Sequence, residues 1–589
     1  MAHADLVLLH APSVYDFRET SIMYGPVSDL VPSSPVFEMY PLGFTTIAEY
    51  MERHGLAVRL VNLAVLMLTK PGYDVERAIR GMDPLAFGID LHWAPHAHGS
   101  IEIARLCKKY HPDTPVVFGG FTASYFHEEL AGYDCVDYVV RGDSTEEPFT
   151  RLMYAIKRGG DVSDIPNLTY TDSSGAVVST PFTHVPDTFD HVNLDYSFSM
   201  RSVIRDRDMI SALPFKGWLS YPVSASLTCR GCTRNCVTCG GSATAFREHH
   251  GRNRIAFRDP ELLIRDIAHI GKHIPGPVFV LNDFRQAGDD YARAFITGLK
   301  RIDFKNPIGF EFFTPPSEDF YALLDENLND YSVEISPESH DDAVRAAFGK
   351  PYTWEALAES IGHAFEHNCQ RFDLYFMTGI PTQTAESVLG TAEAVRDLYA
   401  RIGNNPKLLP FVGPMAPFLD PGSIVYEDPE RFGYTLRAHT LEEHRQLLTQ
   451  PSWKHILNYV PDGMTLDEMV EATYEAAIGL NRVKAKVGAL DEKVAAATER
   501  RILDAQIAMA RIDHILTHEE PERSALLDDF KQEIDLLNES TVCEKTELNW
   551  PARLGPGHFF NNAWLWFRVN LEVLFPRLRR VDRRFMGES

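Results

Sequence analysis

Three cysteines stand close together near the middle of the chain, at Cys232, Cys236 and Cys239, and the segment runs directly into Gly240-Gly241-Ser242. Three thiolates at CxxxCxxC spacing on one short loop can bind three irons of a cubane [4Fe-4S] cluster and leave the fourth iron without a protein ligand. We therefore predict that these three cysteines are metal ligands and that the open iron is the place where chemistry occurs.

Clustered cysteines can also mark a structural zinc site or a disulfide framework. Zinc needs four ligands, usually as two pairs, and although Cys229 lies just upstream, no second cysteine pair follows, nor a CxxC…HxxxH pattern at zinc-finger spacing. Eight cysteines in 589 residues is a low density for a disulfide framework. The remaining four cysteines are isolated in the sequence, so a second cluster is not predicted: Cys107, Cys135, Cys369 and Cys543.

The segment Arg230–Cys239 resembles the cluster loop of the radical S-adenosylmethionine (SAM) enzymes, and three later segments resemble further landmarks of that family in the family's order. Val278–Asp283 is similar to the second barrel strand, which ends in an acidic or amide pair. Tyr331–Ser339 is similar to the strand whose Glu-Ser lies near the SAM ribose, and Phe376–Thr384 to the GxP turn after the next strand. The ordered set is stronger evidence than any one landmark.

This resemblance implies that SAM binds the open iron through its amino and carboxylate groups, and that one electron from the cluster then yields a 5′-deoxyadenosyl radical. Glu338 is expected to accept hydrogen bonds from the ribose hydroxyls. The protein itself has to position SAM and to keep water and oxygen away from the radical. The residues expected to contact SAM are Gly240, Asp283, Glu338, Ser339, Gly379 and Pro381.

The chain departs from the family pattern at two positions. Thr238 stands just before the third cysteine, where the family usually has an aromatic residue. Cys229 occupies a position that is more often Ser or Thr, so it is either a packed small side chain, which we favour, or a spare ligand. Neither departure removes a cluster ligand.

The first 150 residues alternate strand-like and helix-like segments, as a doubly wound α/β sheet requires. A helix is expected over 42–54, after the first strand. Parallel strands of this kind bind ligands in the crevice at their carboxyl ends. The expected strands are 4–10, 57–62, 85–90, 115–120 and 136–142.

This N-terminal part resembles the Rossmann-like cobalamin-binding domain that precedes many radical SAM cores. Gly119-Gly120 at a strand end would let the backbone pass close to a bulky ligand, and a tight strand-to-helix turn accounts for the pair almost as well. Arg141-Gly142-Asp143 with Glu146-Glu147 also matches that domain. The residues expected at a cobalamin site are Asp90, Gly119, Gly120 and Gly142.

Asp90-Leu-His92 imitates the D-x-H-x-x-G motif of proteins in which a histidine binds cobalt. Pro95 stands where the motif has glycine, and the segment ends the third strand, whereas the motif follows the first. We therefore expect no histidine–cobalt bond of that type, with His92, His96 and His98 as polar pocket or surface residues.

Four regions are predicted from these patterns. Residues 1–156 form the cobalamin-binding-like domain, and residues 157–225 form a connector with a β-hairpin around Gly175. Residues 226–425 form the radical SAM core, an incomplete (β/α)6 barrel with its site at the carboxyl ends of the strands. Residues 426–589 are largely helical, and a capping box at Thr465–Glu468 starts a helix that can run to Gly488.

The formal net charge of −25 would repel a phosphate backbone, so a nucleic-acid substrate is not expected. The N-terminus lacks a basic signal-peptide region, and no stretch reaches the apolar length of a membrane span. A reducing cytoplasmic setting suits both the thiols and the cluster.

The C-terminal segment 559–575 is rich in aromatic residues and is followed by several arginines. Aromatic anchors beside basic residues can seat a helix at an anionic membrane surface. The competing interpretation is that the aromatics pack on the protein while the arginines face its acidic surface. The arginines are Arg577, Arg579, Arg580, Arg583 and Arg584.

The resemblance implies a cobalamin-dependent radical SAM enzyme similar to the class B methyltransferases, which methylates an unactivated carbon of a small-molecule, natural-product or lipid substrate through methylcobalamin. A reductant protein such as flavodoxin or ferredoxin is the expected electron donor. Two alternatives stay open: a radical SAM enzyme with a cobalamin-free N-terminal domain that catalyses cyclisation, rearrangement or carbon–carbon coupling, and a non-catalytic cobalamin or redox sensor. The substrate and any general acid or base are not identified by the sequence.

Overall fold

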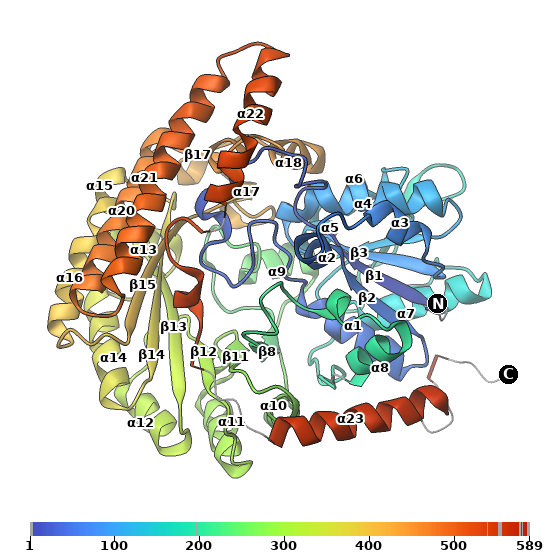
Figure 1. The fold of residues 1–589 in the computed structure, drawn as a ribbon. Coiled ribbons are helices and arrows are strands. Elements are labelled where there is room, and N and C mark those ends of the chain that lie inside the picture. The colour runs from blue at the N-terminus through green and yellow to red at the C-terminus, as the bar shows by residue number, and fades with distance from the viewer. Residues whose placement is uncertain are drawn as a thin grey trace.

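The protein was analysed as a computed structural model that describes residues 4–585 except 196, 539, 552–556, 576–578, 580 and 583. Its N-terminal part is built on one seven-stranded sheet in the order β2-β1-β3-β4-β5-β6-β7 (Figure 1). The first five strands are parallel, as predicted. They are β1 (Leu6–His10), β2 (Val58–Asn62), β3 (Ala86–Asp90), β4 (Val116–Gly119) and β5 (Tyr138–Val140).

Helices cover both faces of this sheet, so the predicted doubly wound fold is confirmed. On one face, α1 (Leu42–Arg53) and α7 (Glu146–Arg158) bury Met51 and Phe149 against strand residues such as Leu8. The other face is covered by α2 (Leu63–Thr69), α3 (Val75–Arg80), α4 (Ala97–Tyr110), α5 (Phe121–Tyr125) and α6 (His127–Ala131). Near-continuous apolar strands are what a sheet buried on both faces requires.

The predicted hairpin forms and belongs to the same sheet. β6 (Leu168–Thr171) pairs antiparallel with β5, and β7 (Val177–Ser179) pairs antiparallel with β6. Asp172 and Gly175, whose φ is +86°, make the turn between them. The sheet is therefore mixed, and the N-terminal sheet continues into the segment predicted as a connector.

The second sheet has six parallel strands in the order β15-β14-β13-β12-β11-β8, and its two ends are not joined. This confirms the incomplete barrel. Helices pack on its outer face, where Val280, Phe310 and Leu374 lie in the main core, while alternate residues such as Glu311 and Tyr375 face the interior. The strands are β8 (Ser224–Leu227), β11 (Val278–Leu281), β12 (Ile308–Glu311), β13 (Tyr331–Glu338), β14 (Arg371–Thr378) and β15 (Leu408–Pro414).

The five longest helices in the described barrel part of the chain connect these strands. They are α10 (Pro260–His273), α11 (Asp289–Arg301), α12 (Glu318–Asn327), α14 (Trp354–Glu366) and α16 (Thr391–Arg401).

The first long helix of the C-terminal region starts at the predicted capping box, in which the Thr465 hydroxyl and the Glu468 carboxylate cap α20 (Leu466–Lys486). This helix ends near Gly488, whose φ is +78°, and it packs against β15. Two further helices follow, α21 (Glu492–Ile515) and α22 (Glu522–Leu537) (Figure 1). The region also contains a small hairpin of β16 (Tyr434–Leu436) and β17 (Tyr459–Pro461).

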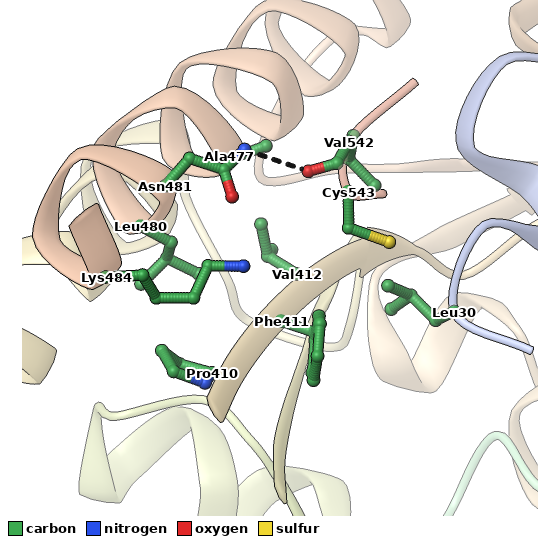
Figure 2. Close-up of a pocket in the computed structure, with 10 residues that line it drawn as sticks. All are labelled: Leu30, Pro410, Phe411, Val412, Ala477, Leu480, Asn481, Lys484, Val542 and Cys543. Carbon is green, nitrogen blue, oxygen red and sulfur yellow. Dashed lines mark hydrogen bonds between the residues drawn. The ribbon is translucent and has the colours of Figure 1, made fainter. Parts of the chain in front are cut away.

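Residues 540–551 return to the barrel. At the β15 edge of the barrel they meet the N-terminal loop that contains Asp29 and Leu30. The buried Asp29 carboxylate accepts the backbone N–H groups of Thr541 and Val542 at 2.6 and 2.8 Å. Figure 2 shows this seam, where Leu30, Phe411 and Cys543 lie together beside α20. The space between the side chains there is too small for a water molecule, so the seam is packed and is not a ligand site.

The same C-terminal segment fills the barrel interior at the amino ends of the strands. The Trp550 indole lies over Gly309, where an added Cβ would come within 1.4 Å of the ring, and it meets the Phe279 ring edge-on at 5.2 Å. The Arg371 guanidinium donates to the carbonyls of Glu547 and Asn549 at 2.6 and 2.8 Å. The barrel interior is thus closed at the end opposite the cysteine loop.

Candidate active site

The cysteine loop follows the first barrel strand, as predicted. It begins after β9 (Cys229–Arg230) and ends at α9 (Ala243–His250). Cys232, Cys236 and Cys239 are all half-buried on this loop. The backbone N–H groups of Arg234 and Gly241 point at the sulfurs of Cys232 and Cys239, each at 3.3 Å. Such donors stabilise thiolates, so the loop fits a thiolate-bound cluster.

Cys229 occupies a different environment from the other three. It is 1% exposed and lies in an apolar cluster with Phe189, Val192 and Ala256. Burial raises the pKa of its thiol to about 12. This position agrees with a packed small side chain rather than a spare ligand.

Glu338 ends β13 with a left-handed backbone, at φ +66°, and is buried. The Lys350 ammonium lies 2.6 Å from its carboxylate and also donates to the Ser336 carbonyl. Burial raises the pKa of Glu338, and the Lys350 charge partly opposes this. The adjacent Ser339 hydroxyl accepts the Asp341 N–H at 3.1 Å.

Lys350 was not found from the sequence. It follows Gly349, which ends α13 (Asp342–Phe348) at φ +104°. A Cβ added at Gly349 would lie 2.6 Å from the Asn235 carbonyl oxygen. A side chain at position 349 would therefore collide with the cysteine loop. The signal in the sequence is only a Gly-Lys pair at a helix end, which by itself indicates a helix stop.

The Asp283 carboxylate is occupied by the protein's own groups. It accepts the Arg285 guanidinium at 2.6 and 2.8 Å and the Phe313 N–H at 3.0 Å. Its neighbour Asn282, at φ +66°, donates its backbone N–H to Glu311 at 2.9 Å. The Glu311 side chain faces the barrel interior. Like Lys350, Glu311 was not predicted as a site residue from the sequence.

Gly379 and Pro381 form the turn after β14. An added Cβ on Gly379 would lie 2.6 Å from the Tyr459 hydroxyl, and the Tyr434 hydroxyl donates to the Gly379 carbonyl at 2.7 Å. The turn is therefore held against the β16–β17 hairpin. Near the cysteines, the Gly240 N–H donates to the Asp420 carboxylate at 3.0 Å.

The glycines of the N-terminal domain divide into two kinds. Gly120, at φ +120°, has the His92 backbone within 2.6 Å of an added Cβ, and Gly142, at φ +101°, has the Phe182 ring at 2.9 Å. The protein's own packing thus requires both glycines. Gly119 has only the Val140 carbonyl, at 3.6 Å, near an added Cβ, so it has the most room for a ligand.

Asp90 is buried and paired with His10 of β1, with 2.9 Å between Oδ1 and Nδ1. Burial lowers the pKa of His92 and of His96 to about 4, so both imidazoles are neutral at pH 7. The carboxyl ends of these strands present half-exposed aromatic rings: His92 lies 5.0 Å from Phe121 and 5.5 Å from Trp93, which is 51% exposed. The rings are tilted by 33° and 38° against one another, and together they offer an aromatic surface at the strand ends for a large ligand.

The fold and the site define a two-domain α/β protein. A doubly wound domain comes first, and an open six-stranded parallel sheet follows, with a three-cysteine loop after its first strand. Known families agree with this class. Residues 30–150 match the family model described as "B12 binding domain", and residues 226–395 match "Radical SAM superfamily". The chain therefore contains a B12-binding domain and a radical SAM domain.

Two curated proteins are similar to parts of the chain. The hopanoid C-3 methylase of Methylococcus capsulatus is 25% identical over 258 residues, 44% of this chain and 44% of that protein. The cytidylyl-2-hydroxyethylphosphonate methyltransferase of Streptomyces wedmorensis is 22% identical over 58% of this chain and 70% of that protein. The chain thus spans less than half the length of the first of these relatives.

Among solved structures, the radical S-adenosylmethionine methyltransferase TsrM from Kitasatospora setae, with cobalamin and a [4Fe-4S] cluster bound, superposes with a TM-score of 0.52 at 17% identity. The match covers 74% of this chain and 81% of that one. It supports the two-domain fold.

Proposed function

We propose that the chain is a cobalamin-dependent radical SAM methyltransferase that methylates an unactivated carbon, with Cys232, Cys236 and Cys239 as cluster ligands. The observation that carries this proposal is the thiolate loop lying directly against the strand-end edge of the B12-binding domain. The Phe121 ring of that edge lies 5.6 Å from Phe246 and 4.7 Å from His250, both on α9. The two methyltransferase relatives support the reaction class.

The cofactors would supply the radical and the methyl group. The chain's own residues would hold SAM, with Glu338 and Lys350 beside the cysteine loop, and the aromatic surface around Trp93 would receive the corrin. Segment 540–551 would keep water out of the barrel from its far end. Reduced flavodoxin or ferredoxin is the proposed electron donor.

Anaerobic reconstitution of the full chain with iron, sulfide and hydroxocobalamin tests the proposal. We expect bound corrinoid absorbance, release of 5′-deoxyadenosine from SAM with dithionite, and metabolites heavier by one methyl group in cells that contain the protein. An intact cluster without corrinoid would favour the cobalamin-free alternative. Bound corrinoid with no 5′-deoxyadenosine would indicate a sensor.

Helix α23 (Gly557–Leu574) supports a second proposal, that the enzyme works at a membrane surface. One face of the helix is anchored to the protein: Leu565 and Val569 are buried, the Asn562 amide donates to the His273 carbonyl at 2.8 Å, and Glu572 pairs with Arg201 at 3.1 Å. Figure 1 shows α23 lying along α10 and α8 (Ser197–Asp206). The helix is therefore fixed with its other face outward.

That outer face is aromatic, and the carboxylate of Glu572 is turned away from it toward Arg201. An apolar patch of this kind marks an interaction surface. Arg568 of the same helix is half exposed and lies 3.6 Å from the second carboxylate oxygen of Glu572. A basic side chain on an aromatic helix suits an anionic bilayer. The exposed large apolar side chains described on α23 and at the residue after it are Phe560, Trp564, Trp566, Phe567, Val573, Leu574 and Phe575, at 37–71%.

Two of the arginines after the helix agree with the competing interpretation, in which the arginines face the acidic surface of the protein. Arg579 lies 2.9 Å from the Glu52 carboxylate and Arg584 lies 3.7 Å from Glu147, so both face the protein. Arg577, Arg580 and Arg583 are outside the described residues. No helix of the described part of the chain is long and apolar enough to cross a membrane. Surface attachment through α23 makes a lipid the substrate class that we favour.

Vesicle flotation measures this attachment. We expect the protein to float with vesicles containing phosphatidylglycerol, and W564A/W566A/F567A to lower the partition coefficient by at least about 1000-fold, since each of the three buried aromatic side chains contributes about 1.5–3 kcal/mol. The exposed variant L389A is the matched control and should float normally. Self-association that the triple variant abolishes, without vesicle binding, would show that a second copy covers this face.

A further inference from the structure

Two ion pairs join the B12-binding domain to the two ends of the cysteine loop. At its start, the Arg230 guanidinium makes a forked contact with Glu146, at 2.5 and 3.0 Å, and donates to the Ser144 hydroxyl at 3.1 Å. After α9, Arg252 makes a forked contact with Asp143, with one N–O distance of 2.9 Å. We call Asp143, Glu146, Arg230 and Arg252 the inter-domain clamp.

The clamp is buried and electrostatically consistent. Arg230 is 8% exposed and Glu146 is 1% exposed. Burial by itself would raise the pKa of Glu146, but Arg230 and His191 hold it well below its ordinary value. Burial would likewise raise the pKa of Asp143, but the hydrogen bonds and charge of Arg252 lower it below its ordinary value. Both carboxylates are therefore charged at neutral pH, and the two arginines compensate these charges in the interior.

Local geometry is adapted to these contacts. Gly231, at φ +102°, lies between Arg230 and the first cluster cysteine, and an added Cβ would come within 2.9 Å of the Arg252 side chain. The absence of a side chain at 231 lets Arg252 cross the start of the loop on its way to Asp143. The two clamp arginines, Arg230 and Arg252, thus flank residues 231–251, which contain all three cluster cysteines.

We infer that the inter-domain clamp is a positioning device that sets the place of the cysteine loop relative to the strand-end edge of the B12-binding domain. The inference rests on the proposed function, because the clamp would serve to hold the cluster site and the cobalamin site at a fixed distance from each other. Forked Arg–carboxylate pairs suit this role because they fix orientation as well as distance.

Other contacts, away from the loop, hold the B12-binding domain to the C-terminal region, which in turn packs on the barrel through α20. The Glu129 carboxylate accepts the backbone N–H groups of Leu441 and Glu442 at 2.9 and 3.0 Å, and the Tyr125 hydroxyl donates to Glu427 at 2.7 Å. Removing the clamp is therefore expected to loosen the loop while the domains stay attached, which makes a clamp variant usable as a test.

The test compares full-length D143N/E146Q with D266N. Asp266 pairs with Arg258 at 2.7 Å and is equally buried, but the pair lies within the radical SAM part of the chain, so D266N is the matched control. Without cofactors, we expect amide hydrogen exchange in 231–251 to become about 100-fold faster in the clamp variant, the scale of losing a buried charge partner. D266N should leave these amides unchanged.

In reconstituted protein, the magnetic coupling between cob(II)alamin and the reduced cluster gives a second readout. The clamp variant should keep its iron and sulfide but show a weakened or heterogeneous coupling. Wild-type exchange and coupling in D143N/E146Q would overturn the inference, as would the same changes in D266N. If the double variant does not fold, the single variants D143N and E146Q are measured in its place, with the same expected and contradicting outcomes. Absence of cobalamin in the wild type would instead reject the proposed function, and the exchange measurement would still test the clamp.

Discussion

Replacing Cys232, Cys236 and Cys239 together with alanine is expected to abolish iron and sulfide binding and to reduce 5′-deoxyadenosine release from SAM to background. The effect is complete because no other thiol can take over: Cys229 is packed in an apolar cluster, and the other four cysteines are buried elsewhere. The measurements are iron and sulfide content after anaerobic reconstitution and SAM cleavage with dithionite.

The matched control is C229A, which removes the nearest other thiol. It should retain the cluster and cost about 1 kcal/mol of stability, the ordinary scale for a buried substitution. A triple variant that still binds iron and sulfide and cleaves SAM would contradict the assignment of all three ligands, and with it the proposed function. Loss of the cluster in C229A would show instead that the packed thiol takes part.

The elements and landmarks that the sequence predicted are those with local signals. Five apolar strands with short loops predicted the doubly wound sheet, and the capping box at Thr465 predicted the start of α20. The cysteine spacing and the segments around Glu338 and Gly379 are short patterns that can be recognised without knowing the fold. The structure places these segments at strand ends of one sheet, as the resemblance implied.

What the sequence could not predict are contacts between distant segments. Lys350 reaches Glu338 only because α13 turns back at Gly349, and Arg230 meets Glu146 across 84 positions. Side chains in such pairs have no periodicity to reveal them. The Arg141-Gly142-Asp143 and Glu146-Glu147 resemblance pointed to cobalamin, whereas in the structure Asp143 and Glu146 bind the arginines that flank the cysteine loop.

The hairpin of β6 and β7 and the segment 540–551 illustrate the same limit on a larger scale. The hairpin was predicted from its turn, but its pairing with β5 depends on which edge of the sheet is available. Segment 540–551 has no strong helix or strand pattern, and it enters the barrel interior because Gly309 leaves room there for an indole. Only the assembled barrel shows that space.

Replacing Trp550 with alanine is expected to destabilise the barrel by about 3–5 kcal/mol, the cost of deleting a buried aromatic side chain that cannot be replaced by collapse of its surroundings. The indole is 8% exposed and covers Gly309 and Phe279, and its backbone N–H donates to the Tyr221 hydroxyl at 2.7 Å. The neighbouring carbonyls that bind Arg371 tie the same segment to β14. A void here would lie at the closed end of the barrel, so we also expect the reconstituted cluster to be lost faster in air.

Urea unfolding followed by tryptophan fluorescence and by far-UV circular dichroism measures the loss, and the two probes are needed because a chain with two domains need not unfold in one step. W564A is the matched control, since Trp564 is 64% exposed on α23 and its removal should change stability by less than about 0.5 kcal/mol. The two variants should therefore separate cleanly: W550A lowers the unfolding midpoint and speeds cluster loss, whereas W564A leaves both unchanged and weakens vesicle binding. Equal midpoints for W550A and the wild type would mean that segment 540–551 does not support the barrel and that other residues close this end of the site.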